Sequence, residues 1–229
     1  MQQEEKPNAH QKIRKFISKY AKPAAVFLAA VLVLFVVVEV INFANEKKAE
    51  KATAIIEDIQ TRLADALKEE QDISKLSLAK YQSYLDEIDG VIAEYPKEYA
   101  GLRALFMKGD MLYSFREYDK AAAAYSEFAA KYPDSYDAPI AIYNVGVCYE
   151  NLGKNAEAEA EYLKIYNNYK DDYAMMPKLV FTLGRLAENS QKYSDAEKYY
   201  NQITAEYPES NYSLYGQDRI ILMKSKGQL

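Results

Sequence analysis

The feature that most constrains the fold is a motif that returns at a nearly constant interval. Tyr-Pro pairs end at Pro96, Pro133 and Pro208. The first interval is 37 residues, and the second is 75 residues, or two steps with the proline missing near Lys170. Self-similarity at a period of about 20–50 residues indicates a stack of like supersecondary units rather than a single globular core.

A glycine also recurs upstream of each of these positions, at Gly109, Gly146 and Gly184. Apolar residues around it are spaced three, four and seven apart, which predicts the first amphipathic helix of each unit (helix A). A glycine inside a helix costs about 1 kcal/mol relative to alanine. Its return in one register therefore predicts that a second helix crosses closely there, where no side chain fits.

The second predicted helix of each unit (helix B) carries a small residue, then a tyrosine and a large apolar residue. The expected buried positions are Ala121, Tyr125 and Phe128, then Ala158, Tyr162 and Ile165, and then Ala196, Tyr200 and Ile203. We expect Asp119, Asn155 and Ser194 to cap these helices, and Ser194 to form a capping box with Glu197. Proline then ends each helix B.

This order of Leu, Gly, Leu or Tyr, Ala, Tyr, a large apolar residue and Pro resembles the tetratricopeptide repeat (TPR). Three repeats begin near Leu102, Pro139 and Pro177 and cover residues 100–210. The segment Tyr132–Ala138 resembles the YP-x-S-x-x-A spacing of bacterial cell-envelope TPR proteins. The first repeat lacks an expected aromatic residue and the second lacks its final proline. The resemblance implies an all-α fold, with helix-turn-helix repeats of 37–38 residues stacked into an α-solenoid.

The segments on both sides of the repeats are also predicted to be helical. Residues 45–98 indicate a degenerate first repeat with a turn near 71–74, ahead of a TPR domain at 99–229. A coiled-coil seam is the alternative for residues 49–66, although fewer than three heptads are present. An amphipathic helix at 211–226 is expected to cover the end of the solenoid.

An apolar segment runs from Pro23 to Ala44, with no polar residue between Ala24 and Val38. Its 21 residues after the proline would make a helix of about 31 Å, the thickness of a bilayer core. A cleaved signal peptide is the alternative. Its apolar region would be shorter, however, and Asn42 occupies the −3 position before Ala44, where cleavage requires a small residue. Residues 23–44 are therefore predicted to be an uncleaved transmembrane signal anchor.

Charge predicts the direction of this span. Residues 1–22 carry a net charge of +4, and the remaining residues carry −9. Because basic flanks stay in the cytoplasm, we expect a single-pass protein of the bacterial inner membrane with its TPR domain in the periplasm. Glu39 would lie near the far interface, where its carboxylate reaches water; contact with another membrane helix is the alternative.

Composition argues against catalysis. The chain has one cysteine, Cys148, and one histidine, His10, which stand 138 positions apart. This spacing excludes a zinc site of paired Cys and His, an iron–sulfur site and an internal disulfide. Glycine-rich phosphate loops are missing too. We expect no enzyme activity, no cofactor, no small-molecule substrate and, at a net charge of −5, no nucleic-acid partner. Cys148 is expected in the core.

The TPR resemblance implies a protein-binding groove lined by helix A. The matching positions are Arg103, Phe106, Asp110 and Tyr113, then Ile140, Tyr143 and Val147, and then Lys178, Phe181 and Arg185. Lys178 and Arg185 would form a positive patch at its C-terminal end. The carboxylate clamp of chaperone-binding TPR domains is excluded, because Asp110 stands where a terminal carboxylate would bind.

Three classes of function follow. The arrangement of a basic tail, one span and an acidic TPR body resembles the YfgM-like ancillary subunits of the Sec translocon, a family that links translocation to periplasmic chaperones. The alternative resemblance is to TPR coordinators of cell division or of outer-membrane assembly, which lack an uncleaved anchor. An enzyme or receptor is the third class, and no residue constellation supports it.

Overall fold

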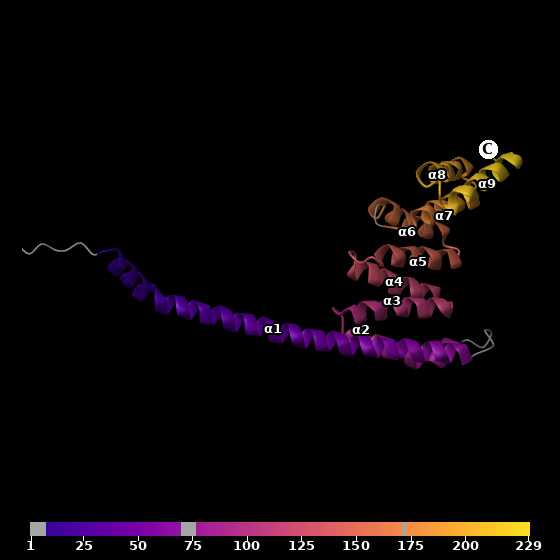
Figure 1. The fold of residues 1–229 in the computed structure, drawn as a ribbon. Coiled ribbons are helices and arrows are strands. Elements are labelled where there is room, and N and C mark those ends of the chain that lie inside the picture. Colours follow the sequence, from indigo (N-terminus) through magenta and orange to yellow (C-terminus); the bar gives the residue numbers. More distant parts are fainter. Residues whose placement is uncertain (1–7, 70–76, 171–172) are drawn as a thin grey trace, which may run out of the picture. The chain divides into compact units, whose positions relative to one another are not determined.

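The computed structural model describes residues 8–69, 77–170 and 173–229, and every regular element in these ranges is a helix (Figure 1). The helices are α1 (Ala9–Glu69), η2 (Leu78–Tyr81), α2 (Gln82–Glu94), α3 (Tyr99–Ser114), α4 (Tyr118–Lys131), α5 (Ala138–Asn151), α6 (Asn155–Asn168), α7 (Met176–Asn189), α8 (Tyr193–Glu206) and α9 (Asn211–Ser225). The predicted all-α class is confirmed. The turn expected at residues 71–74 lies outside the described residues. The chain divides into two compact units, residues 1–51 and 52–229.

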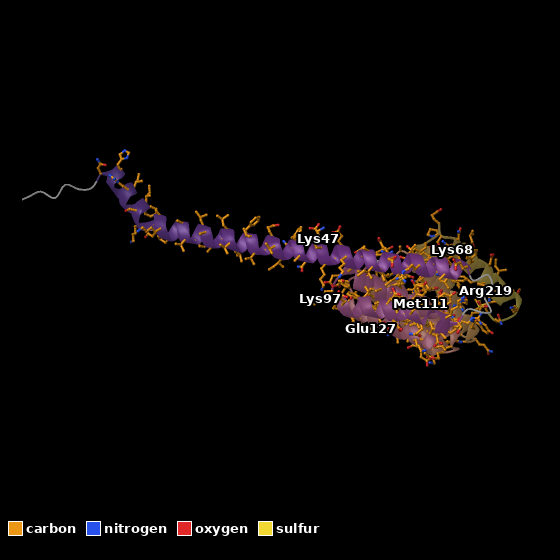
Figure 2. All side chains as sticks on the ribbon, turned by 90° about the horizontal axis from the view of Figure 1, so that it is seen from below. Lys47, Lys68, Lys97, Met111, Glu127 and Arg219 are labelled. Atoms are coloured by element: carbon orange, nitrogen blue, oxygen red, sulfur yellow. The ribbon has the colours of Figure 1, made fainter. Side chains whose placement is uncertain are left out.

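In the first unit, the apolar side chains of α1 are exposed. Val26 is 70% exposed and Phe27 is 69% exposed, and their neighbours project from the ribbon in the same way (Figure 2). In the described part of the chain, this helix alone is long and apolar enough to cross a membrane. It begins at Ala9, so Pro23 stands inside the helix rather than at its start.

The second unit begins with the last part of α1, which packs against α2. Ala52, Ile56 and Ile59 are buried in one core with residues of α2 and α3. The guanidinium of Arg62 bonds to the carboxylate of Glu87 at 2.5 Å, and the Tyr81 hydroxyl donates to the backbone carbonyl of Ala66. The apolar face of residues 52–63 is therefore covered within this unit, which removes the basis for a coiled-coil seam there.

Three helix pairs follow, α3/α4, α5/α6 and α7/α8, and they match the three predicted repeats (Figure 1). The nine residues predicted to be buried in helix B have exposed fractions of 2% or less. Cys148 is also buried. A first core cluster covers residues 52–148 and a second covers residues 158–223. The small, tyrosine and large positions of the sequence pattern therefore hold the repeats together.

Each recurring glycine lies beneath the tyrosine of its own helix B. A β-carbon added at Gly109 would come 2.6 Å from Cε1 of Tyr125, and one at Gly184 would come 2.6 Å from Cε1 of Tyr200. At Gly146 the same carbon would stand 2.7 Å from Cζ of Tyr162. Ordinary carbon contacts are about 3.5–4.0 Å, so the close crossing predicted from the glycine register is confirmed.

The predicted N-caps of helix B are wrong. Asp119, Asn155 and Ser194 all lie within their helices. The residues at the N-cap are instead Glu117, Lys154 and Lys192, and none makes a side-chain capping bond.

A left-handed residue sets this turn in every repeat. Arg116, Gly153 and Gln191 have φ of 63°, 74° and 60°. The next amide bonds back to the end of helix A, as in Glu117 N–H to the Leu112 carbonyl at 2.9 Å. Backbone bonds of this kind close a helix without a polar side chain, so the cap residues that the sequence analysis sought are not needed.

Helix B ends at the same register with or without proline. α4 ends two residues before Pro133, and α6 ends two residues before Lys170. The residue between is a tyrosine in both cases. Tyr132 donates its hydroxyl to the Pro96 carbonyl at 2.8 Å, and Tyr169 donates to the Pro133 carbonyl at 3.3 Å. This hydroxyl bond ties the first and second matched repeats to the units before them, which explains why the tyrosine recurs at position 169, where the proline does not.

α9 packs on α8 and closes the C-terminal end of the unit. Ser210 caps it by accepting a bond from the Tyr212 amide at 3.3 Å. Arg219 in α9 forms a two-pronged ion pair with the buried Glu188 of α7. The predicted final helix is therefore present and is fixed to the third repeat.

Candidate binding surface

The ten residues predicted to line a groove lie on the first helices of the repeats, α3, α5 and α7. We call this set the helix-A surface. All are half-buried except Asp110, which is exposed. Partial exposure is what a rigid contact surface needs, because each side chain is fixed by packing and still reaches solvent.

Three of the four aromatic residues of this surface are anchored on the tyrosines of helix B. Phe106 lies 5.4 Å from the Tyr125 ring centroid, and Tyr143 lies 5.0 Å from that of Tyr162. Phe181 repeats the arrangement at 5.5 Å from Tyr200. Aromatic pairs at such separations add about 0.5–1.5 kcal/mol beyond burial. The sequence register therefore places the three rings equivalently in three repeats.

In each of the three repeats, a carboxylate accepts a hydrogen bond from the hydroxyl of the buried tyrosine. Tyr125 donates to Asp110 at 2.6 Å, Tyr162 donates to Glu150 at 2.7 Å, and Tyr200 donates to Glu188 at 3.0 Å. Burial, followed by the neighbouring carboxylate, raises the pKa of each of these tyrosines well above 10, the usual value. The phenols therefore stay protonated and act as fixed donors.

Asp110 itself is perturbed in the direction expected of a desolvated acid. Although the residue as a whole is exposed, its carboxyl group lies against Tyr125. Desolvation of that group raises the pKa, and the hydrogen bond from Tyr125 acts in the opposite direction. Because its side chain belongs to the helix-A surface, that surface contains a carboxyl group that loses its proton less readily than the carboxyl group of a fully solvated aspartate.

The two cations of the expected positive patch already contact other side chains of the same protein. Arg185 bonds to Glu150 of the preceding repeat at 2.6 Å. Lys178 places its ammonium 4.6 Å from the centre of the Tyr143 ring. Both cations thus bridge neighbouring repeats, and the prediction of an open positive patch is corrected: the charge of Arg185 is balanced by Glu150.

The N-terminal end of the helix-A surface is hollowed. A cleft of about 180 Å³ is lined by Arg103, Phe106 and Asp110, together with Gln60 of α1 and residues at the starts of α3 and α5. Arg103 bonds to Gln60 and Glu57 across this cleft. The first repeat and the last part of α1 therefore form one continuous wall.

Sequence reasoning missed two aromatic residues at the opposite end. Tyr212 and Tyr215 of α9 lie 5.5 Å and 6.2 Å from Phe181, between ring centroids. We call these three residues the aromatic end cluster. The signal was available, because Tyr215 follows Lys178 by 37 residues and Leu222 follows Arg185 by 37. Extending the repeat period into α9 adds Tyr215 and Leu222 to the helix-A surface, whereas Tyr212 joins it only through its contact with Phe181.

The described residues contain no group of His, Cys, Asp or Glu side chains that could hold a metal ion. Burial raises the pKa of the Cys148 thiol to about 11, and its side chain is fully covered. Cys148 is therefore a packing residue.

Comparison with known proteins identifies the repeats. Two family models, both described as tetratricopeptide repeat, match residues 85–136 and 106–173 and residues 180–210. Together they cover more than half of the 229 residues. A "TPR repeat-containing protein" of Treponema pallidum (strain Nichols) is 25% identical over 118 residues, which are 52% of this chain and 48% of that protein. The chain thus spans about half the length of this curated relative.

Solved structures agree on the fold. A tetratricopeptide repeat protein from Parabacteroides merdae ATCC 43184 has a TM-score of 0.54 at 16% identity, covering 76% of this chain and 61% of that one. Nearly identical TPR-like repeats from Podosopora anserina give 0.54 at 12% identity, covering 79% and 89%. The family models, together with the repeat geometry described above, show that the chain is a tetratricopeptide repeat protein with one long apolar helix ahead of its repeats.

Proposed function

We propose that this protein is a membrane-anchored scaffold of the bacterial cell envelope, which binds partner proteins through its helix-A surface. The observation that carries the proposal is the partly exposed aromatic ring held in one register by three successive repeats. Stacked repeats offer extended concave surfaces for binding, and anchored aromatic residues at an interface centre commonly contribute most of the affinity.

The exposed apolar face of α1 supports the membrane anchor. Soluble proteins rarely leave apolar surfaces of this length uncovered, whereas lipid would cover residues 24–43 on every side. The basic segment before them supports a cytoplasmic N-terminus, and with it a periplasmic TPR domain. Protease added to spheroplasts with an opened outer membrane should digest the TPR domain. A TPR domain that stays protected until the inner membrane is lysed would reverse the orientation.

The partner is a protein segment with apolar or aromatic anchors. Phe106, Tyr143 and the aromatic end cluster provide apolar contact at intervals of one repeat. Arg185 is bound to Glu150 and so cannot serve as the main contact for an acidic partner without breaking that pair. Apolar anchors therefore supply the affinity, and the flanking charges select among partners.

In vivo photo-crosslinking tests the surface directly. A photoreactive phenylalanine analogue replaces Val147 or Tyr215 on the helix-A surface, and the matched control replaces Ala160, an exposed residue of α6. We expect partner crosslinks from the first two positions and none from the third. Crosslinks from Ala160 alone would move binding to the helix-B side and refute the groove.

The identity of the crosslinked proteins distinguishes the candidate processes. Sec translocon subunits together with periplasmic chaperones would support a role in linking secretion to folding, which the resemblance to the YfgM-like family favours. Division or outer-membrane assembly proteins would support the alternative role as a coordinator. Retrieval of a low-molecular-mass substrate instead of a protein would support the enzyme or receptor class.

A further inference from the structure

A second surface of the TPR domain lies at the loop between the first two matched repeats. Its first notch adjoins the N-terminal cleft of the helix-A surface, with which it shares Tyr99 and Leu102. Two notches adjoin there, with volumes of about 380 and 810 Å³. Both are lined by Pro133, Asp134 and Ser135. The loop that joins α4 to α5 thus forms a ridge with a notch on each side.

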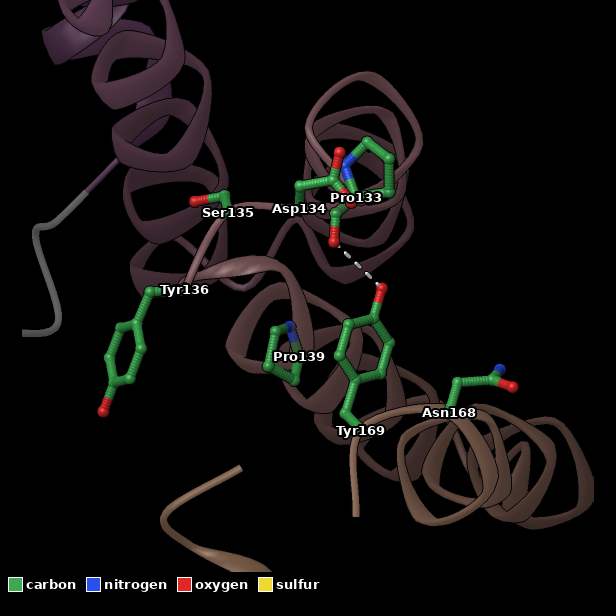
Figure 3. A pocket seen from close by; sticks show the side chains of 7 residues that line it. All are labelled: Pro133, Asp134, Ser135, Tyr136, Pro139, Asn168 and Tyr169. Atoms are coloured by element: carbon green, nitrogen blue, oxygen red, sulfur yellow. Dashed lines mark hydrogen bonds between the residues drawn. The ribbon is translucent and has the colours of Figure 1, made fainter. Parts of the chain in front are cut away.

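The two notches are built from the same register of successive repeats. One is lined by Tyr99, Leu102 and Tyr132, and the other by Tyr136, Pro139 and Tyr169. Each pair of equivalent residues is 37 positions apart. Figure 3 shows the second notch, with Pro139 drawn between the Tyr136 and Tyr169 rings. A ligand that fits one notch can therefore fit the next by repeating the same side chain.

One tyrosine of each notch is fixed and the other is free. The hydroxyls of Tyr132 and Tyr169 are bonded to the backbone carbonyls of Pro96 and Pro133. The dashed line in Figure 3 marks the second of these bonds. Tyr99 and Tyr136, by contrast, are 66% and 71% exposed. Each of these exposed rings stands beside a proline and a second tyrosine or a leucine in its notch, and exposed apolar groups that gather in this way mark an interaction surface.

The charge of this surface is negative. Lys131, the cation of the first notch, is bonded to Glu127 at 2.6 Å. Asp134 lines both notches, and it makes no ion pair with any residue that the structure describes. An exposed tyrosine ring beside an unpaired carboxylate suits a guanidinium or ammonium group, which can pair with one and stack on the other.

We propose that this ridge binds a proline-rich extended segment that carries a basic residue. Such segments hold a polyproline II conformation without internal hydrogen bonds and dock into notches lined by aromatic side chains. Prolines or other apolar side chains would fill the two notches, and an Arg or Lys between them would meet Asp134. The ridge would give the scaffold a second contact beside the one proposed for the helix-A surface, and the notch at Tyr136 shares no lining residue with that surface.

A labelled peptide tests the proposal on the full chain in detergent micelles. The probe is a fluorescein-labelled nonapeptide of three Arg-Pro-Pro units, followed by fluorescence anisotropy near physiological salt. Three Glu-Pro-Pro units keep the conformation and reverse the charge, and three Arg-Gly-Ser units keep the charge and lose the conformation. We expect saturable binding of the first peptide, at least about tenfold tighter than binding of the other two.

Variants localise the binding. Tyr136→Ala and Asp134→Asn should each weaken binding of the Arg-Pro-Pro peptide by about tenfold. Tyr215→Ala removes another exposed ring, at 51% exposure, from the helix-A surface and should change binding by less than about twofold. Because Tyr136 and Asp134 are exposed, thermal unfolding should match that of the unsubstituted chain.

Three outcomes would overturn the proposal. They are no saturable binding of the Arg-Pro-Pro peptide, equal binding of the Arg-Gly-Ser peptide, and unchanged binding by Tyr136→Ala. Loss of binding in Tyr215→Ala with retention in Tyr136→Ala would place the peptide on the helix-A surface instead. None of these results bears on the crosslinks expected from Val147.

Discussion

Replacing Gly146 with alanine tests the packing on which every repeat depends. In an open helix this substitution stabilises by up to about 1 kcal/mol. At Gly146, however, the new carbon would stand 2.7 and 2.9 Å from Cζ and Cδ1 of Tyr162. The ring would have to retreat by roughly 1 Å to restore ordinary contact. It is fully buried, its hydroxyl is held by Glu150 at 2.7 Å, and Tyr143 packs against it.

Because the ring has no free space, overpacking should cost about 1–3 kcal/mol. Gly90 is the matched control, since it lies inside α2 with nothing within 4 Å of the added carbon. Gly90→Ala should therefore raise the melting temperature, whereas Gly146→Ala should melt about 2–12 °C below the Gly90→Ala variant, at about 2–4 °C per kcal/mol. Gly146→Val should melt lower still.

Near-ultraviolet circular dichroism of the full chain in detergent measures these melting temperatures. All tyrosines except Tyr20 lie between residues 81 and 215, so the signal reports on the TPR domain rather than on the apolar helix. In a Tyr162→Leu background the cost of Gly146→Ala should fall, because the ring that it meets is gone. Equal stabilisation by alanine at both glycines would refute the reasoning.

Three further predictions concern the turns, the thiol and a carboxylate. Gln191→Gly should stabilise the chain by about 1 kcal/mol and Gly153→Ala should destabilise it similarly, because both positions have positive φ; the opposite ranking in thermal melts would contradict this. Cys148, whose thiol has a pKa of about 11, should react with maleimide at pH 8 only after denaturation, and fast labelling of the native chain would exclude its burial. Burial raises the pKa of Asp110, so ionisation opposes folding, and Asp110→Asn should gain stability over the unsubstituted chain as pH rises from 3 to 7; a gain that shrinks over this range would reverse the sign.

The positions that the sequence predicted well are those whose partners lie within one repeat. The glycine of helix A and the tyrosine of helix B are 16 residues apart in each case, as for Gly109 and Tyr125. Their recurrence in one register marks them as packing partners, and the structure places one beneath the other. The apolar run at residues 24–38 is likewise a local property, and the structure leaves it uncovered.

The N-caps show where local pattern fails. Asp119, Asn155 and Ser194 are good capping residues by type, and Ser194 also stands three residues before Glu197, as in a capping box. The turn is in fact fixed by a left-handed backbone at Arg116, Gly153 and Gln191. Two of these three residues are not glycine or asparagine, so their conformation leaves no clear mark in the sequence.

By itself, then, the sequence determined the repeat period, the helical class, the buried face of each helix and one helix able to span a membrane. Tertiary structure alone decided which charges are free and which surfaces are continuous. Arg185 contacts Glu150 from 35 residues away, Tyr215 of the single helix α9 contacts Phe181, and Pro133 lines two neighbouring notches. The physical reason is that the periodicity of side chains along a helix shows which of its faces is buried. Contacts between repeats form only when those faces stack. A single ion pair or ring contact across the stack leaves no periodic pattern in the sequence.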